Sequence, residues 1–216
     1  MTLPDPPLLL VTDRRQARRP LAAVVAAALE AGCRWISLRE KDLPQDEQIA
    51  LLRLLLPLTR KHGGFLSLHG DAALAARPGA DGIHLPSGSD AAAARAAIGR
   101  GKLVGLSIHS VPEAQRVDPA LIDYALAGPA FETPSKPGYG PEIGRIGLAE
   151  MARAASVPLL AIGGLNTLRV PEVVAAGCAG IAAMGAVMRA ADPGREVEAL
   201  IVSLNAARAL SAPDKY

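Results

Sequence analysis

The sequence predicts an α/β fold, a single-domain (β/α)8 TIM barrel over residues 1–216 with its core over about 8–210. Three observations predict it. Short apolar runs recur eight times, amphipathic Ala-rich segments separate them, and 216 residues suffice for that many strand–helix units. Half of the residues are hydrophobic and only 3% are aromatic, so we expect a core of Ala, Leu, Val and Ile.

The apolar runs are typical of parallel strands that are covered on both faces. The eight expected strands cover 8–11, 34–38, 65–68, 81–85, 102–107, 121–127, 158–162 and 179–184. A doubly wound open sheet is the alternative, and it normally carries a glycine-rich loop after its first strand. Here that position reads VTDRRQARR, which contains no glycine, and the barrel is therefore favoured.

The segments between the strands carry helix start and stop signals. The first, 20–32, begins with Pro20, which suits a first helical turn, and ends on Gly32, a common C-terminal cap. The longest, 44–63, contains Pro57, which we expect to kink the helix. The other expected helices lie within 71–79, 89–99, 110–117, 145–156, 166–177 and 195–211.

Charge and composition exclude several classes of protein. The formal net charge is +2 and the basic residues are dispersed, except for the cluster RRQARR at 14–19, which we interpret as a solvated loop and helix start. We therefore expect no nucleic-acid partner. Cys33 and Cys178 lie far apart and indicate no disulfide framework. The apolar run at 8–11 is too short for a signal peptide or a membrane span, so we expect a cytoplasmic protein without a membrane partner.

In such a barrel, functional residues collect at the C-terminal ends of the strands. Arg39 and Lys41 directly follow the second expected strand. The loop after the sixth strand places Thr133, Ser135 and Lys136 within four residues, between glycines and prolines. These side chains are interpreted as donors to an anionic ligand that bears phosphate. The alternative is an ordinary loop rich in turn formers.

Two glycine-containing segments strengthen the interpretation as an anion site. IGG at 162–164 and MGA at 184–186 follow the seventh and eighth strands, where backbone amides at helix starts can form a nest for an anion. Barrels commonly bind phosphate at this place. Both segments are expected on the same face as the cations.

The four histidines differ in their expected roles. His62 ends a long helix, where it interacts favourably with the helix dipole, and we expect it to be structural. His84 lies within a strand and reads equally well as a core histidine whose ring is hydrogen-bonded. His69 and His109 fall at the ends of strands and are candidate general acids or bases near neutral pH.

A catalytic metal site would need paired carboxylates, for which Asp13, Asp71 and Asp90 are the candidates. Asp71 and Asp90 each open a helix, however, where N-capping is the simpler explanation. No metal site is therefore expected from these residues alone.

The motifs together resemble the thiamine phosphate synthase/TenI superfamily. The matching segments are VTD, ISLREK, ADGIHLPSGS, GLSIHS, GPAFETPSK, AIGGLN and GIAAMGAV, and they run through most of the chain, to about residue 187. The resemblance implies a TIM barrel whose small-molecule substrate is thiazole phosphate, the sulfur-containing half of thiamine. Barrels of this family commonly oligomerise, so a homo-oligomer is among the expectations.

The synthase branch of this family joins thiazole phosphate to hydroxymethylpyrimidine diphosphate and releases pyrophosphate with the help of Mg²⁺. The resemblance assigns pyrophosphate binding to Arg39, Lys41 and Ser107. It matches Thr133, Ser135 and Lys136 to the Thr-x-Thr-Lys loop of the synthases, and Gly164, Met184 and Gly185 to their backbone phosphate nest, so all six are expected to bind substrate or phosphate.

This chain departs from the synthase pattern at three places. Ser37 stands where the synthases have a Gln on the pyrimidine side, and His69-Gly70 stands where they have Asn-Asp, the Asp being a Mg²⁺ ligand. Their second Mg²⁺-binding Asp aligns with Ser89. A synthase reading therefore requires a metal site rebuilt from Asp71, Asp90 or Asp13.

Other features resemble the TenI branch, a thiazole tautomerase that moves a proton on thiazole carboxylate phosphate without a metal. These are LPSGS after the fourth strand and FET in the loop after the sixth. The acid–base His of that enzyme corresponds to Pro129 here, so the candidate catalytic residues become His69, His109 and Glu132.

From the sequence we expect a TenI-like enzyme or accessory protein without a cofactor. Two alternatives stay open: a thiamine phosphate synthase that uses Mg²⁺, and a non-catalytic barrel that binds a phosphate ligand.

Overall fold

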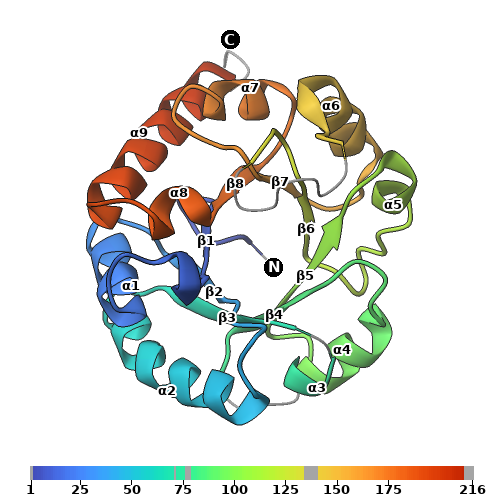
Figure 1. Ribbon diagram of the computed structural model, residues 1–216. Helices are drawn as coiled ribbons and strands as arrows, with labels where there is room; N and C mark the ends of the chain where they lie inside the picture. Colours follow the sequence, from blue (N-terminus) through green and yellow to red (C-terminus); the bar gives the residue numbers. More distant parts are fainter. Residues whose placement is uncertain (1, 71, 76–78, 134–140, 212–216) are drawn as a thin grey trace.

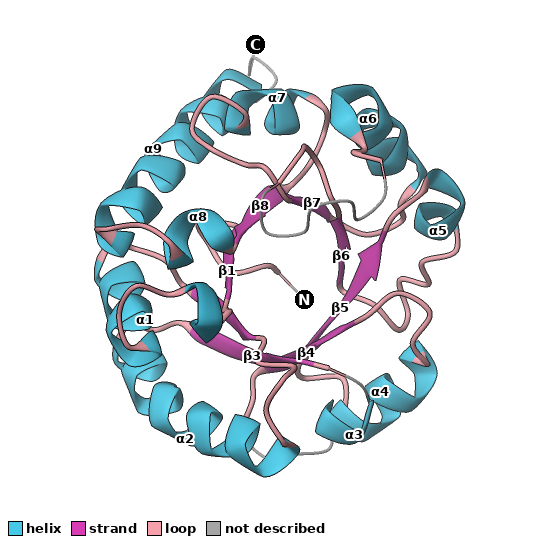
Figure 2. Cartoon of the chain, viewed as in Figure 1, coloured by secondary structure: helices cyan, strands magenta, loops and turns pink. Residues whose placement is uncertain are grey.

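The computed structural model describes residues 2–70, 72–75, 79–133 and 141–211. Its eight strands are all parallel and close into a barrel in chain order, surrounded by helices (Figures 1 and 2). The strands are β1 (Leu8–Val11), β2 (Trp35–Leu38), β3 (Phe65–His69), β4 (Gly82–Leu85), β5 (Leu103–Ile108), β6 (Tyr124–Ala127), β7 (Leu159–Ile162) and β8 (Gly180–Ala183). The predicted (β/α)8 TIM barrel is confirmed.

The helices form the outer ring of the barrel (Figure 2). They are η1 (Arg14–Gln16), α1 (Leu21–Glu30), α2 (Gln45–Lys61), α3 (Ala72–Ala75), α4 (Ala91–Ile98), α5 (Val111–Gln115), α6 (Gly144–Ala154), α7 (Val170–Ala175), α8 (Gly185–Met188) and α9 (Pro193–Ser211). The helix α2 continues through Pro57. The segment 14–19, expected as a solvated loop and helix start, holds η1, a single turn of 3-10 helix.

The expected sixth strand extends too far toward the N-terminus. Residues 121–123 form a turn, and β6 begins at Tyr124. The reason is the side chain of Asp123, which accepts hydrogen bonds from the Val104 amide at 2.8 Å and from the Arg95 guanidinium at 2.6 Å. These contacts hold residue 123 at the entrance of the strand.

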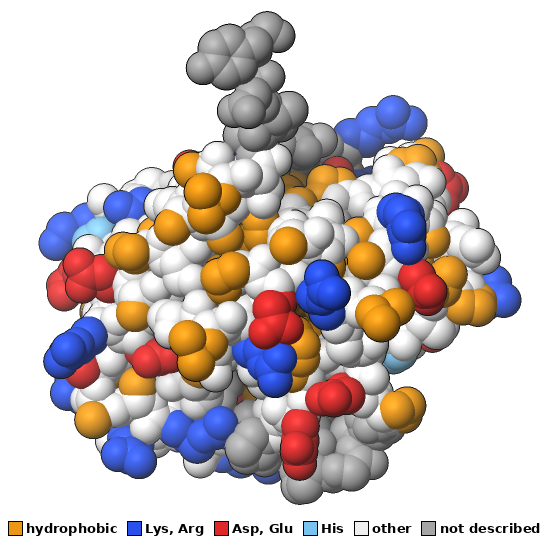
Figure 3. All heavy atoms as spheres, turned by 90° about the horizontal axis from the view of Figure 1, so that it is seen from above, with side chains coloured by type: hydrophobic (Ala, Val, Ile, Leu, Met, Phe, Trp, Pro, Cys, Tyr) orange, Lys and Arg blue, Asp and Glu red, His pale blue; other side chains and the backbone are white. Residues whose placement is uncertain are grey.

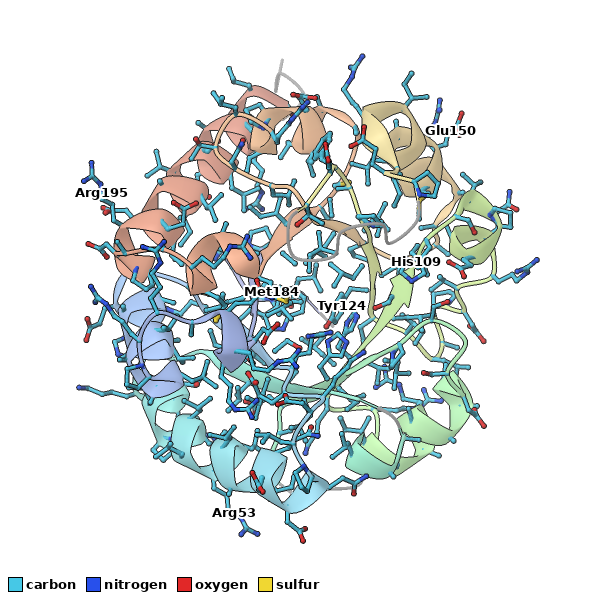
Figure 4. All side chains as sticks on the ribbon, viewed as in Figure 1. Arg53, His109, Tyr124, Glu150, Met184 and Arg195 are labelled. Carbon is cyan, nitrogen blue, oxygen red and sulfur yellow. The ribbon has the colours of Figure 1, made fainter. Side chains whose placement is uncertain are left out.

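Side chains fill the barrel interior in layers. One cluster of apolar residues packs between strands and helices, and a second, smaller cluster lies inside the barrel. In the inner cluster, Trp35 and Tyr124 make an edge-to-face contact with ring centroids 4.7 Å apart. Figure 4 shows Tyr124 and Met184 near the centre of the ring, whereas Arg53 and Arg195 project outward.

The N-terminal segment lies across one end of the barrel (Figure 1). Leu3 packs against the inner cluster, and the amide of Ile181 donates to the carbonyl of Pro7 at 3.0 Å. A Cβ on Gly180 would lie 2.3 Å from that carbonyl oxygen, so only glycine permits this close approach. A ligand therefore enters from the opposite end, where the strands finish.

The outer surface carries charged side chains of both signs on the face seen in Figure 3. No helix within the described ranges is long and apolar enough to cross a bilayer. On the face seen in Figure 3, acidic and basic side chains are intermixed and no large patch carries a single sign of charge. Cys33 and Cys178 are both buried free thiols.

Candidate active site

A cavity of about 510 Å³ opens at the C-terminal ends of the strands. Its lining combines three kinds of group: cationic side chains, hydroxyl or imidazole side chains, and glycine-rich backbone. The lining residues are Val11, Arg39, Lys41, His69, Pro86, Ser87, Ser107, His109, Leu126, Gly128, Pro129, Glu132, Thr133, Ile162, Gly163, Gly164, Leu165, Asn166, Ala182, Ala183, Met184, Gly185, Ala186 and Arg189.

A buried carboxylate organises the cationic side of the cavity. Glu40 is 1% exposed and accepts hydrogen bonds from the Thr12 hydroxyl at 2.7 Å and from the Arg14 amide at 3.1 Å. The same hydroxyl accepts a bond from the Arg39 amide at 2.9 Å. Thr12 and Glu40 thus tie the end of β1 to the end of β2, which fixes the backbone that carries Arg39 and Lys41.

The helical turn η1 adds a second layer to this corner. The Arg14 guanidinium bonds Asp42 at 2.8 Å and Glu40 at 3.3 Å. Its hydrogen bond holds the pKa of the Asp42 carboxyl below its usual value. Arg14 is therefore engaged with carboxylates of its own chain, and the basic residues that line the cavity are others.

The loop after β6 lies against the end of β7. The amide of Phe131 donates to the carbonyl of Gly163 at 3.1 Å. Gly164 has a positive φ of +65°, and a Cβ there would lie 2.4 Å from the carbonyl oxygen of Glu132. The glycine is required both for its backbone conformation and for this close approach. This packing holds Thr133 at the cavity wall, opposite the cationic corner.

The end of β8 supplies backbone amides. Met184 is the N-terminal cap of α8, and the first amides of a helix have no partner within the helix. Gly185 and Ala186 line the cavity together with Gly164. Arg189, the C-terminal cap of this short helix, also lines the cavity and contacts Gln16.

Two histidines reach the cavity from different strands. The Nδ1 of His109 lies 2.6 Å from the carbonyl oxygen of Gly128. Because a carbonyl oxygen only accepts, Nδ1 carries a proton and donates it. His69 is 7% exposed and its ring packs against His84, with centroids 4.7 Å apart. Figure 4 shows His109 at the end of β5.

The structure brings most of the predicted site residues together. Arg39, Lys41, His69, Ser107, His109, Glu132, Thr133, Gly164, Met184 and Gly185 all line the one cavity. Ser135, Lys136 and Asp71 lie outside the described residues.

Other candidates have structural roles. Asp90 caps α4 by accepting from the Ala93 amide at 2.9 Å, and Asp13 caps η1. His62 is the C-terminal cap of α2, as expected. Sequence reasoning missed Arg189 and the buried role of Glu40. Only the place of Arg189, three residues after the MGA segment, could have pointed to it.

The described residues do not fit a Mg²⁺ ion. This ion requires several oxygen ligands, usually including carboxylates. Among the described residues no three His, Cys, Asp or Glu side chains gather. Glu132 is the one described carboxylate in the cavity lining, and Glu40 is occupied by Thr12 and Arg14.

Comparison with known proteins identifies the relatives of this chain. The family described as "Thiamine monophosphate synthase" matches residues 8–187. The chain is 42% identical over 195 residues to a protein of Roseiflexus sp. (strain RS-1) named thiamine-phosphate synthase, covering 88% of this chain and 82% of that protein. It is 35% identical over 212 residues to a protein of the same name from Acidothermus cellulolyticus, covering 95% and 98%.

Solved structures agree with the sequence relatives. A thiamine phosphate pyrophosphorylase from Pyrococcus furiosus superimposes with a TM-score of 0.82 at 30% identity, over 93% of this chain and 96% of that one. The names of these relatives are those of the synthase branch. None of these three relatives is named TenI, although some sequence features of this chain resemble that branch.

Proposed function

We propose, since the chain belongs to the thiamine monophosphate synthase family, that it joins thiazole phosphate to hydroxymethylpyrimidine diphosphate and releases pyrophosphate. The observation that carries the proposal is that the lining of one cavity offers two regions whose chemistry suits an anion. A transferase with two phosphorylated substrates can use both regions, one for each substrate.

The two regions differ in chemistry. One contains the side chains of Arg39, Lys41 and Ser107 at the ends of β2 and β5. The other contains the backbone of Gly164 and Gly185 at the ends of β7 and β8. Flexible cationic side chains suit a diphosphate whose charge grows as it leaves, and fixed amides suit a phosphate that is only held.

In the proposed reaction the thiazole nitrogen bonds to the pyrimidine methylene carbon as the carbon–oxygen bond to the diphosphate breaks. The electron pair of that bond moves onto the departing pyrophosphate oxygen. Arg39 and Lys41 would stabilise the developing charge, and Ser107 would donate a hydrogen bond to it. The apolar side chains of Val11, Leu126 and Ile162 would exclude water from the reacting carbon.

A second candidate function is the TenI-like proton transfer expected from the sequence. His109 favours it, because its Nδ1 is anchored on Gly128 while the ring lines the cavity. The scarcity of described carboxylates in the lining also suits a reaction without a metal. His69 and Glu132 remain candidate partners for the proton in that reaction.

The test is a direct assay. Purified protein is mixed with thiazole phosphate and hydroxymethylpyrimidine diphosphate, in Mg²⁺ and separately in EDTA, and thiamine phosphate is quantified. We expect thiamine phosphate to form in the Mg²⁺ arm, and the EDTA arm shows whether the metal is required. The Arg39→Ala variant should form thiamine phosphate about 10²–10³-fold more slowly. The Arg53→Ala variant, which removes a cation from the outer face of α2, is the matched control and should retain activity.

Failure to form thiamine phosphate would contradict the synthase proposal. Thiazole carboxylate phosphate is then the next substrate, and proton transfer that is lost in a His109→Asn variant would establish the second candidate. Saturable binding of thiazole phosphate without turnover of either substrate would indicate a non-catalytic binding barrel.

A further inference from the structure

Four neighbouring strands place a row of residues at one level of the barrel interior. The register pairs His69 on β3 with His84 on β4, His84 with Gly105 on β5, and Gly105 with Tyr124 on β6. The rings lie side by side, with centroid distances of 4.7 Å between the two histidines and 5.5 Å between His84 and Tyr124. The row lies directly below the cavity, because His69 is part of the cavity lining.

Gly105 makes the contact between His84 and Tyr124 possible. A Cβ at this position would lie 2.1 Å from Cζ of Tyr124 and 2.5 Å from Nδ1 of His84. Any side chain on β5 here would separate the two rings. The missing side chain lets groups on β4 and β6 reach each other across the strand between them.

Two hydrogen bonds connect the row to the cavity. The Tyr124 hydroxyl lies 3.0 Å from Nδ1 of His84, and Nε2 of His84 lies 2.9 Å from the Ser107 hydroxyl. Tyr124 and His84 are 1% and 0% exposed, whereas Ser107 lines the cavity. The chain of hydrogen bonds therefore runs from the closed interior to the ligand space.

The direction of the protons follows from burial. Among the described residues, Nδ1 of His84 is the hydrogen-bond partner of the Tyr124 hydroxyl. The hydroxyl must donate this bond, because otherwise its proton would be buried without an acceptor. Burial also keeps the His84 ring neutral, by lowering its pKa to about 3. The one ring proton then sits on Nε2 and is donated to Ser107, whose own hydroxyl proton is left to point into the cavity.

We propose that Tyr124 and His84 are positioning residues that hold the Ser107 hydroxyl as a hydrogen-bond donor to an anionic phosphate or diphosphate oxygen in the cavity. The inference rests on the proposed function, which places such an oxygen beside Ser107. Without the relay, the serine proton could turn inward to Nε2 of His84 and would then be lost to the ligand.

The variant Tyr124→Phe tests the relay. It removes the hydroxyl but keeps the ring that packs on Trp35 and His84. In the variant a proton on Nδ1 of His84 no longer faces the tyrosine O–H, so the preference for the Nε2–H tautomer falls and Ser107 donates into the cavity for a smaller fraction of the time. We expect the Kd for inorganic pyrophosphate, measured by calorimetry without turnover, to rise about 5–10-fold.

A double-mutant cycle separates this role from a merely structural one. If Tyr124 acts through Ser107, adding Tyr124→Phe to Ser107→Ala should change the Kd by less than about twofold. The control is Ser67→Ala, which removes another buried interior hydroxyl, bonded to the Ile36 carbonyl and unconnected to the row. It should leave the Kd unchanged. The proposal would be overturned if Tyr124→Phe bound pyrophosphate as tightly as the wild type. It would also be overturned if Tyr124→Phe weakened pyrophosphate binding equally in the wild-type protein and in Ser107→Ala.

The tautomer of His84 gives a readout on the unmodified protein. Nitrogen-15 NMR of the full chain should show His84 neutral with its proton on Nε2, and a proton on Nδ1 would overturn the proposal even if the variants do not fold. Both measurements are independent of turnover. Absence of thiamine phosphate in the assay would therefore count against the proposed function and not against the relay.

Discussion

His84 is a histidine that the fold keeps neutral. Burial lowers its pKa from 6.5 to about 3, and the nearby charge of Lys41 adds to this shift. In the unfolded chain the ring regains its ordinary pKa and binds a proton more readily. The stability that this difference gives is fully present above about pH 6.5 and is lost as the pH falls toward the folded-state value.

The expected loss can be measured by urea unfolding. Between about pH 7.5 and about pH 5.5, His84 alone should lower the free energy of unfolding by about 1.4 kcal/mol. A His84→Gln variant should be less stable at neutral pH but should lack this component of the pH dependence. Equal pH dependence in the two proteins would mean that folding does not lower the pKa of His84.

At the scale of the elements, Gly164 joins the end of β7 to the loop after β6. Its φ of +65° disfavours any residue with a side chain, and a Cβ added there would lie only 2.4 Å from the carbonyl oxygen of Glu132. We expect Gly164→Ala to lower the free energy of unfolding by about 1–3 kcal/mol, because the new Cβ must displace the loop. Thiazole phosphate should bind more weakly as the nest widens.

The matched control for that variant is Gly101→Ala. Gly101 lies before β5 and has an ordinary φ, and a Cβ added there would have no neighbouring atom within 4 Å. This substitution should be neutral or slightly stabilising. Chemical unfolding and calorimetric titration with thiazole phosphate compare the two variants, and equal effects would show that the contact with Glu132 is not what requires glycine.

The elements also show what a sequence can predict. The strands of the barrel can be located to within a few residues, because a strand buried on both faces is a continuous apolar run, as in β1. The expected β6 is too long because Leu121 and Ile122 are also apolar, and the contacts of Asp123 with Arg95 and with the Val104 amide mark the boundary. The four-residue helix α8 is too short for a periodic pattern, so only its start is expected from the sequence.

Most of the candidate site was predictable because parallel strands all end at one mouth, so residues that follow strands must converge. What depends on register was not predictable. Gly105 gives no sign in the sequence that it lets His84 and Tyr124 come into contact, and Glu40 gives none that it is buried under Thr12. These pairs are far apart in the chain, and only the closed barrel brings them together.

At the scale of the whole molecule, the barrel concentrates positive charge at the mouth while its net charge is only +2. Arg39, Lys41 and Arg189 line the cavity with a single described carboxylate, Glu132. Homo-oligomerisation stays a prediction. The imbalance at the mouth means that an anion bound there should stabilise the entire fold, because it binds the native state and not the unfolded chain.

Pyrophosphate at about 100 times its Kd should therefore add about 2.7 kcal/mol to the free energy of unfolding, a rise in Tm of about 5–10 °C. The rise should persist in EDTA, because the described lining offers cations to the anion and too few carboxylates to a metal. Arg39→Ala should reduce the rise and Arg53→Ala should not. If Mg²⁺ alone raised the Tm, or if pyrophosphate acted only together with Mg²⁺, a metal site would have to exist that includes residues beyond the described ones, Asp71 first among them.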